Sequence, residues 1–351
     1  MREKVIYFLK MLLLLLIGLL GVFVFKLLHL PLPWLLGPIV ISAIVTRYPK
    51  LPIARPAILS IPARLVLGLA IGSTFTPAIF PYISSYLYSL IFIFPFVILI
   101  AIFGTWYYIR VAKMDVMTAF FSTMPGGLLE MVTFGEAKGA NVRAITLTQS
   151  ARLLMLVVIL PFIIEIFFHI PLNKSIHIAP AFSEVSYLEM LIMAVVATIG
   201  WKVAERFKMA GSVLIGSMIA GAVAYSFGVL THKPPEEFLF FAQLVLGIMV
   251  GSSFKGVSKY ELFITLRAAF GFFLILTVIC LIFVGIVYYF TDFDLVSIML
   301  AFSPGGQTEM MIIAMVIASN IPYIALHHVT RIFLIMAISP IFAHWLDRKK
   351  R

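Results

Sequence analysis

The chain has 351 residues and a formal net charge of +11; 62% of its residues are hydrophobic and 12% are charged. A soluble domain has about half of its residues apolar, so this composition excludes an ordinary soluble fold and indicates a polytopic membrane protein. Lys and Arg are spread over many short loops, which fits the positive-inside rule and argues against a nucleic-acid partner. The single cysteine, Cys280, excludes an intramolecular disulfide and a cysteine-based metal cluster.

Ten membrane-spanning helices are predicted. Unbroken apolar runs favour helices over the alternating strands of a barrel, and a helix needs roughly 20 residues to cross the hydrocarbon core. The first run follows a short charged start, as in a signal peptide, but it is too long and lacks a small-residue cleavage site, so we assign it as the first span. The predicted spans are residues 5–28, 33–46, 57–75, 84–110 and 142–169, followed by 186–203, 211–230, 238–254, 262–290 and 321–346.

Two further apolar segments, residues 115–138 and 294–318, each carry a Pro-Gly-Gly sequence. The first reads MPGGLLEM over residues 124–131, and the second reads SPGGQTEM over residues 303–310. Proline breaks a helix, and inside a bilayer no water satisfies the backbone groups that are freed. Such a costly feature, present twice, indicates a function.

The two sequences belong to an internal duplication with a constant offset. Pro304 lies 179 residues after Pro125, and the same offset relates the pattern LVLG…GS.F at residues 65–75 to residues 244–254. It also pairs Asp115 with Asp294, Asn141 with Asn320, and Arg152 with Arg331. One gapless offset across separate segments is the signature of a repeat. We assign residues 1–172 to a first membrane repeat and residues 180–351 to a second, together forming one integrated membrane domain.

Loop charges predict the orientation of the repeats. If each Pro-Gly-Gly segment turns back within the membrane, each half has five spans, and an odd number inverts the second half. With a cytoplasmic N-terminus, the cytoplasmic parts are then all basic: 47–55, 110–113, 138–143, 202–208, 255–259 and 348–351. The outer parts are uncharged, weakly charged or acidic-leaning: 76–82, 173–184, 232–237, 291–294 and 319–322. Full crossing would place two basic loops outside, against the charge bias.

We therefore expect an all-α polytopic fold built as an inverted repeat. Each half has about five spans and one re-entrant Pro-Gly-Gly segment. The location that fits is a bacterial-type inner (plasma) membrane, with both termini cytoplasmic.

The Pro-Gly-Gly turns are the candidate substrate- or ion-binding site. Each turn ends one short helix and starts another, with glycine allowing a tight backbone, so N–H groups face an anion and carbonyls face a cation. Broken helices of this kind line the midplane site in transporters. The alternative is an ordinary turn in a buried helical hairpin. The predicted site residues of the turns are Pro125, Gly126, Gly127, Ser303, Pro304, Gly305, Gly306 and Gln307.

Glu130 and Glu309 follow the second glycine of each turn by three positions. One interpretation is that each carboxylate caps its own helix N-terminus, which is favourable by roughly 0.3–1 kcal/mol. The other is that it binds a proton or cation, since intramembrane carboxylates are costly. Both interpretations stay open.

Arg152 and Arg331 lie within the last span of each half, one turn after Gln149 and His328. A deep arginine opposite a re-entrant loop needs a fixed partner. That partner is either a glutamate of the turn, which gives a structural ion pair, or an anionic substrate held in bidentate fashion. The second half, with His328 in place of Gln149, is the more polar of the two.

The third span of each half carries Gly-x-x-x-Gly-Ser, ending at Ser73 and at Ser252. Small-residue spacing favours close helix packing. The alternative is that these serines supply oxygens to the site.

Catalytic chemistry has no support in the sequence. The histidines are dispersed, and no set has metal-ligand spacing. No nucleophile motif and no phosphate loop is present, and Gly126-Gly127 is too short for a nucleotide fingerprint. We predict no enzyme activity, no metal and no cofactor.

With its paired sequences TMPGGLLEM at residues 123–131 and FSPGGQTEM at residues 302–310, the chain resembles the duplicated AbrB-type integral membrane proteins over nearly its whole length. Members of that family carry the labels transcriptional regulator and ammonia monooxygenase, but the residues offer neither a DNA-binding module nor a metal-ligand cluster. The predicted arrangement is also similar to that of inverted-repeat carboxylate and glutamate transporters, which is an analogy of fold.

Our leading hypothesis is a secondary transporter of a small solute, with organic anions among the candidates and a proton or cation as coupling ion. Alternating access would come from motion of the re-entrant core against a scaffold of the other spans. A membrane-embedded small-molecule sensor or regulatory partner is the alternative, and a membrane monooxygenase subunit is third. The lipid bilayer is an expected partner, and a homo-oligomer stays open.

Overall fold

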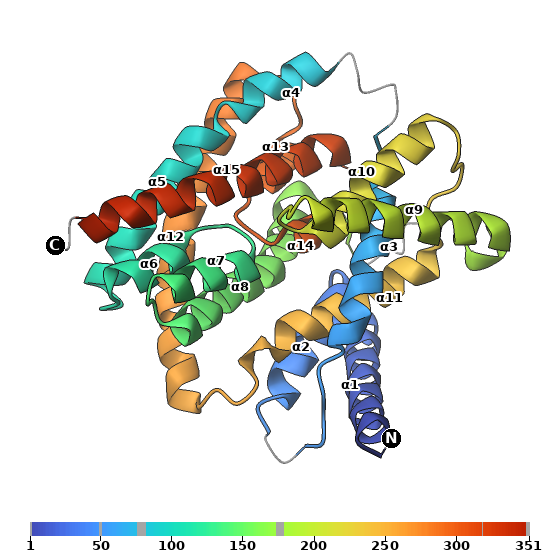
Figure 1. The fold of residues 1–351 in the computed structure, drawn as a ribbon, viewed down its shortest axis with the longest axis horizontal. Helices are drawn as coiled ribbons and strands as arrows, with labels where there is room; N and C mark the ends of the chain where they lie inside the picture. The colour runs from blue at the N-terminus through green and yellow to red at the C-terminus, as the bar shows by residue number, and fades with distance from the viewer. Residues whose placement is uncertain (1, 49–50, 76–81, 173–178, 318, 349–351) are drawn as a thin grey trace. The chain divides into compact units, whose positions relative to one another are not determined.

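The structure is a computed structural model that describes residues 2–48, 51–75, 82–172, 179–317 and 319–348, and every regular element in these ranges is helical (Figure 1). The predicted outer loop 76–82 and the basic tail 348–351 lie mostly outside the described residues, as do residues 173–178 of the outer loop 173–184 and Lys50 of the first basic loop. The α-helices are α1 Arg2–Leu27, α2 Pro33–Val45, α3 Ser60–Gly72, α4 Ile83–Leu90, α5 Ile93–Arg110, α6 Val116–Thr123, α7 Leu128–Ala137, α8 Val142–Phe168, α9 Tyr187–Arg206, α10 Ser212–Ser226, α11 Glu236–Gly251, α12 Lys259–Phe290, α13 Leu295–Phe302, α14 Gln307–Val316 and α15 Ile321–Arg348.

Seven helical stretches among the described residues are long and apolar enough to cross a membrane, and the chain is accordingly an integral membrane protein. They are Glu3–Leu27, Ser84–Arg110, Val142–Phe168, Tyr187–Arg206, Glu236–Phe254, Lys259–Phe290 and Ile321–Ser339. Each coincides with a span predicted from the sequence. The prediction of apolar membrane helices at these seven positions is confirmed.

The other three predicted spans form helices that are shorter than expected. Helices α2 and α3 have 13 residues each, and α10 has 15. At a rise of 1.5 Å per residue they are about 20–22 Å long, whereas the hydrocarbon core is about 30 Å thick. Their position is confirmed, and their crossing of the membrane stays a prediction.

The span predicted at residues 84–110 is interrupted between α4 and α5. Pro95 has no N–H to donate to the carbonyl of Ile91, so a continuous helix would lose that hydrogen bond and meet a steric clash. The chain instead bends at Ile91 and Phe92 and starts α5 at Ile93, which puts the proline in the first turn of the new helix. A proline is well tolerated at that place.

The helices group into two compact units, and each contains parts of both halves of the sequence. Unit 1 consists of residues 1–78, 157–258 and 311–318, and unit 2 consists of residues 79–156, 259–310 and 319–351. Both Pro-Gly-Gly sequences belong to unit 2. Helices α8 and α14 contribute residues to both units.

Unit 1 is packed through glycines at positions that the 179-residue offset relates. A Cβ atom on Gly21 of α1 would lie 2.4 Å from the carbonyl oxygen of Gly37 on α2, and a Cβ on Gly200 of α9 would lie 2.3 Å from that of Gly216 on α10. These helices therefore touch backbone to backbone, which only glycine allows.

The Gly-x-x-x-Gly-Ser sequences also pack closely within unit 1. Gly68 of α3 lies against α10, and Gly247 of α11 lies against α2. Ser73 donates to the carbonyl of Ala70 at 2.8 Å, so this hydroxyl bonds within its own helix end. Ser252 bonds in the same way, at 3.2 Å to the carbonyl of Met249. The observed contacts favour the packing interpretation for both segments.

Candidate functional site

Each Pro-Gly-Gly sequence separates two short helices in unit 2. Helices α6 and α7 flank residues 124–127, and α13 and α14 flank residues 303–306. Asp115 caps α6 by accepting from the backbone N–H of Thr118 at 3.0 Å, and Asp294 caps α13 by accepting from that of Ser297 at 2.7 Å. The break in the helix at each proline is as predicted.

The asparagines that precede α8 and α15 cap these helices. Asn141 accepts from the N–H of Ala144 at 3.0 Å, and Asn320 accepts from that of Tyr323 at 3.2 Å. Their own N–H groups donate to the hydroxyls of Thr118 at 2.8 Å and of Ser297 at 3.0 Å. In each half these bonds tie the start of a long helix to the short helix before the Pro-Gly-Gly turn.

Gln149 and His328 bind carbonyls at matching positions of the short helices. Gln149 donates through Nε2 to the carbonyl of Phe121 at 2.6 Å, and Nε2 of His328 lies 2.9 Å from the carbonyl of Leu300. A carbonyl only accepts, so Nε2 of His328 carries the proton and Nδ1 is free to accept. Both side chains satisfy carbonyls in a last helical turn, which has no intrahelical donors.

Arg152 and Arg331 are buried in unit 2 and hold the backbone of the broken helices. Arg152 donates through Nη1 to the carbonyl of Thr123 at 3.2 Å. Arg331 donates to the carbonyls of Ser303 at 2.6 Å and Gly305 at 3.0 Å, and to Nδ1 of His328 at 3.0 Å. With 4% and 2% of their surface exposed, both arginines are enclosed by protein.

The sequence analysis considered a glutamate or a substrate as the arginine's partner and did not foresee these carbonyl partners. The signal was present in the sequence. A Pro-Gly-Gly turn leaves carbonyls without donors at the end of the preceding helix, and a buried guanidinium has several donors to offer.

Four buried donors at these turns have no hydrogen-bond partner among the residues that the structure describes. They are Nε of Arg152, Nε of Arg331, Oγ of Ser303 and Nε2 of Gln307. An unsatisfied buried polar group costs about 1–3 kcal/mol. The two guanidinium groups also act on each other electrostatically, so positive charge is concentrated here. Donors and positive charge together suit an acceptor-rich, anionic ligand.

The second glycine of each turn leaves room for a glutamate carboxylate. A Cβ atom on Gly127 would lie 2.0 Å from Oε2 of Glu130, and one on Gly306 would lie 2.0 Å from Oε2 of Glu309. Gly127 has φ −63° and ψ 136°, a conformation open to any residue. The backbone of Gly127 therefore does not itself need glycine, and the missing Cβ leaves room for the Glu130 carboxylate.

Each carboxylate lies at the N-terminal end of its own helix, the geometry of the capping interpretation. Glu130 is partly exposed, whereas Glu309 is buried. Position N3 is the place from which a glutamate reaches back to the N-cap N–H group.

Each turn packs on the long helix of the other half within unit 2. A Cβ on Gly126 would lie 3.1 Å from Cγ2 of Ile335 on α15, and one on Gly306 would lie 3.2 Å from Cδ1 of Leu153 on α8. Each turn thus contacts the long helix that carries the arginine of the other half. Ser73 and Ser252, the remaining predicted site residues, belong to unit 1.

A buried polar chain that the sequence analysis missed joins Ser89 of the first half to Tyr323 and His327 of the second half. Oγ of Ser89 lies 2.6 Å from the hydroxyl of Tyr323 and 2.7 Å from Nε2 of His327. Nδ1 of His327 lies 2.8 Å from the carbonyl of Tyr323, so it is the donor nitrogen and Nε2 accepts from Ser89. Ala144 and Thr148 stand at the positions in the first half that match Tyr323 and His327.

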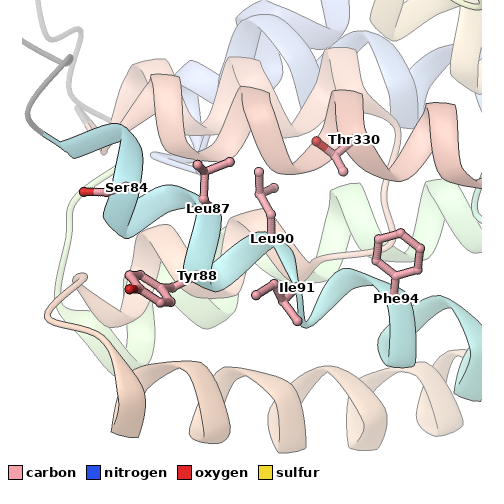
Figure 2. A pocket seen from close by; sticks show the side chains of 7 residues that line it. All are labelled: Ser84, Leu87, Tyr88, Leu90, Ile91, Phe94 and Thr330. Carbon is pink, nitrogen blue, oxygen red and sulfur yellow. The ribbon is translucent and has the colours of Figure 1, made fainter.

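A hollow of about 460 Å³ lies between α4–α5 and α15, where Thr330 faces a group of largely apolar side chains (Figure 2). Its lining consists of Ser84, Leu87, Tyr88, Leu90, Ile91, Phe94 and Thr330. It contains none of the predicted site residues and no charged group, so it does not suit an anionic solute.

Among the described residues, no three His, Cys, Asp or Glu side chains are placed to hold a metal ion. The absence of enzyme activity stays a prediction.

Comparison with known proteins identifies relatives over most of the chain. The family model described as transition state regulatory protein AbrB matches residues 44–347. The chain is 24% identical over 364 residues to "Uncharacterized protein YhjN" of Bacillus subtilis, covering 94% of this chain and 92% of the relative. It is 26% identical over 326 residues to "Putative regulator AbrB" of Escherichia coli, covering 91% of each. No solved structure matches.

Proposed function

The chain belongs to the AbrB family of membrane proteins, and we propose that it is a secondary transporter of a small solute, with organic anions as the favoured class. The observation that carries this proposal is the pair of buried arginines, Arg152 and Arg331. Each holds a carbonyl of a broken helix and keeps an Nε–H group without a partner among the described residues. Intramembrane charges are costly and typical of substrate pathways, and broken helices typically line transporter sites.

We further propose that the two repeats are inverted and that each Pro-Gly-Gly segment is re-entrant, in an inner membrane with both termini cytoplasmic. The basic loops of the sequence support this orientation. The matching hydrogen bonds of the two turns support a common origin.

Single cysteines test the inversion, introduced on a Cys280→Ala background. Lys138→Cys should react with a membrane-impermeant maleimide from the cytoplasmic side, and Ser319→Cys from the outer side. Reaction of both from the same side would refute the inverted repeat.

Both turns and both arginines belong to unit 2. A movement of this unit as one body would carry the two half-sites together, and this is the motion that we propose for alternating access. Residues that hold the turns, such as Arg331, then serve to keep the site intact during the motion.

Uptake into proteoliposomes tests the transport proposal directly. We expect accumulation of at least one member of a panel of radiolabelled acetate, lactate, succinate and citrate, with strong loss in Arg331→Gln. Arg206→Gln is the matched control, because Arg206 is exposed at the end of α9. Accumulation by neither wild type nor control would refute the organic-anion class.

A regulatory role is the second candidate, favoured by the names of the family and of the Escherichia coli relative. A membrane-embedded sensor would bind a small anion at the same donors without moving it. Saturable binding of a panel member with no uptake would support this role over transport.

A further inference from the structure

The carboxylate of Glu309 lies at a helix start, a position that suits an anion. Its Oε2 atom occupies the space where a Cβ of residue 306 would be, at the start of the ten-residue helix α14. The N-terminus of a helix attracts negative charge through its dipole and its free N–H groups. The side chain is buried, with 7% of its surface exposed.

Several hydrogen-bond donors near the start of α14 are left without an acceptor when the Glu309 carboxylate lies there. Oγ of Ser303, Nε2 of Gln307 and Nε of Arg331 are buried and lack a partner among the described residues. Arg331 also donates to the carbonyl of Gly305, which fixes its guanidinium beside the turn. These unused donors indicate that a further acceptor-rich group binds here.

The other ionisable groups near Arg331 leave the site positive. His328 accepts from Arg331 and donates to a backbone carbonyl, so it is held as a neutral ring. Arg152 on α8 adds a second positive charge, and Cys280 on α12 is a further ionisable neighbour of Arg331. A second carboxylate entering next to an ionised Glu309 would be repelled in this poorly solvated site.

We propose that the side-chain carboxylate of Glu309 occupies a site that also binds the carboxylate of a small organic acid. The acid binds by displacing the Glu309 carboxylate, and Glu309 takes up a proton at the same time. The carboxylate of the solute replaces that of Glu309 at the start of α14, and one proton from the aqueous phase converts Glu309 to its neutral acid. For a monocarboxylate this exchange leaves the net charge of the site unchanged, and for each acid the proton on Glu309 is the coupling ion. This inference rests on the proposed function for its anionic solute.

Calorimetry on the full-length protein in lipid nanodiscs tests the coupling. Acetate, lactate, succinate and citrate are titrated separately in buffers that differ in ionisation enthalpy, which measures the protons bound with each acid. For the member that binds wild type most tightly, we expect about one proton taken up and an affinity that rises toward tenfold per unit decrease in pH. Glu309→Gln should show neither effect.

Gly306→Ala provides a second variant that keeps the glutamate. Its methyl group would meet Oε2 at 2.0 Å and push the carboxylate off the helix start, so the affinity for the same acid at neutral pH should rise about two- to fivefold. Gly285→Ala is the matched control, because a Cβ there meets nothing within 4 Å.

Binding without proton uptake by wild type, or equal affinities in Gly306→Ala and Gly285→Ala, would overturn the inference. Binding of none of the four acids would overturn it as well. Proton-linked binding without uptake into vesicles would instead refute transport and leave the inference standing. Uptake of succinate into vesicles without a linked proton would overturn the inference and leave the transport proposal standing.

Discussion

Replacement of Arg331 by Met should destabilise the protein more than the same change at Arg152. Arg331→Met leaves the carbonyls of Ser303 and Gly305 and the Nδ1 atom of His328 without their donor. Each buried group that loses its partner costs about 1–3 kcal/mol, and removal of a buried charge offsets part of the sum. We expect a net loss of about 2–4 kcal/mol in the free energy of unfolding.

Arg152→Met removes one good hydrogen bond, to the carbonyl of Thr123 at 3.2 Å, so its expected cost is about 1–2 kcal/mol. Arg206→Met is the control and should change the stability by less than about 0.5 kcal/mol, since Arg206 is exposed. Denaturant unfolding in mixed micelles, followed by tryptophan fluorescence, measures all three. If Arg331→Met proves as stable as the control, or less harmful than Arg152→Met, the assignment of Arg331 as the holder of the second turn is wrong.

Three further changes test other contacts. His328→Gln should keep the thermal midpoint within a few degrees, because Gln149 makes the same carbonyl bond in the first half; a collapse would show that the imidazole is needed. Ser89→Ala should lower the free energy of unfolding by about 1–3 kcal/mol, since a buried imidazole nitrogen loses its donor, and an unchanged value would contradict the buried chain. Gly68→Ala should destabilise far more than Gly285→Ala, because a Cβ at Gly68 would lie 1.8 Å from a serine oxygen.

The repeat offset made much of the site predictable from the sequence. The offset pairs Asp115 and Asn141 with Asp294 and Asn320, and all four cap helices in the structure. Caps and helix breaks depend on a few neighbouring residues, so a local pattern is sufficient to place them.

Features that depend on distant packing were not predictable. The grouping of helices into two units, each with parts of both halves, is a property of contacts between remote segments. Ser89 stands in an apolar run with no polar counterpart in the other half, so nothing in the sequence connected it with His327. The Pro-Gly-Gly turns indicated carbonyls without donors, but nothing in the sequence placed Arg152 and Arg331 against those carbonyls.

The two halves differ in the side chains that hold the two Pro-Gly-Gly turns. The first turn has a glutamine and an arginine that bind one carbonyl each at good distance, whereas the second has a histidine and an arginine that also bind each other. The second turn is therefore held by more bonds and contains the buried glutamate, Glu309, while Glu130 of the first turn is partly exposed. If a proton is exchanged at only one half-site, these differences assign it to the second, because burial makes the ionisation of a carboxylate most sensitive to the arrival of another anion.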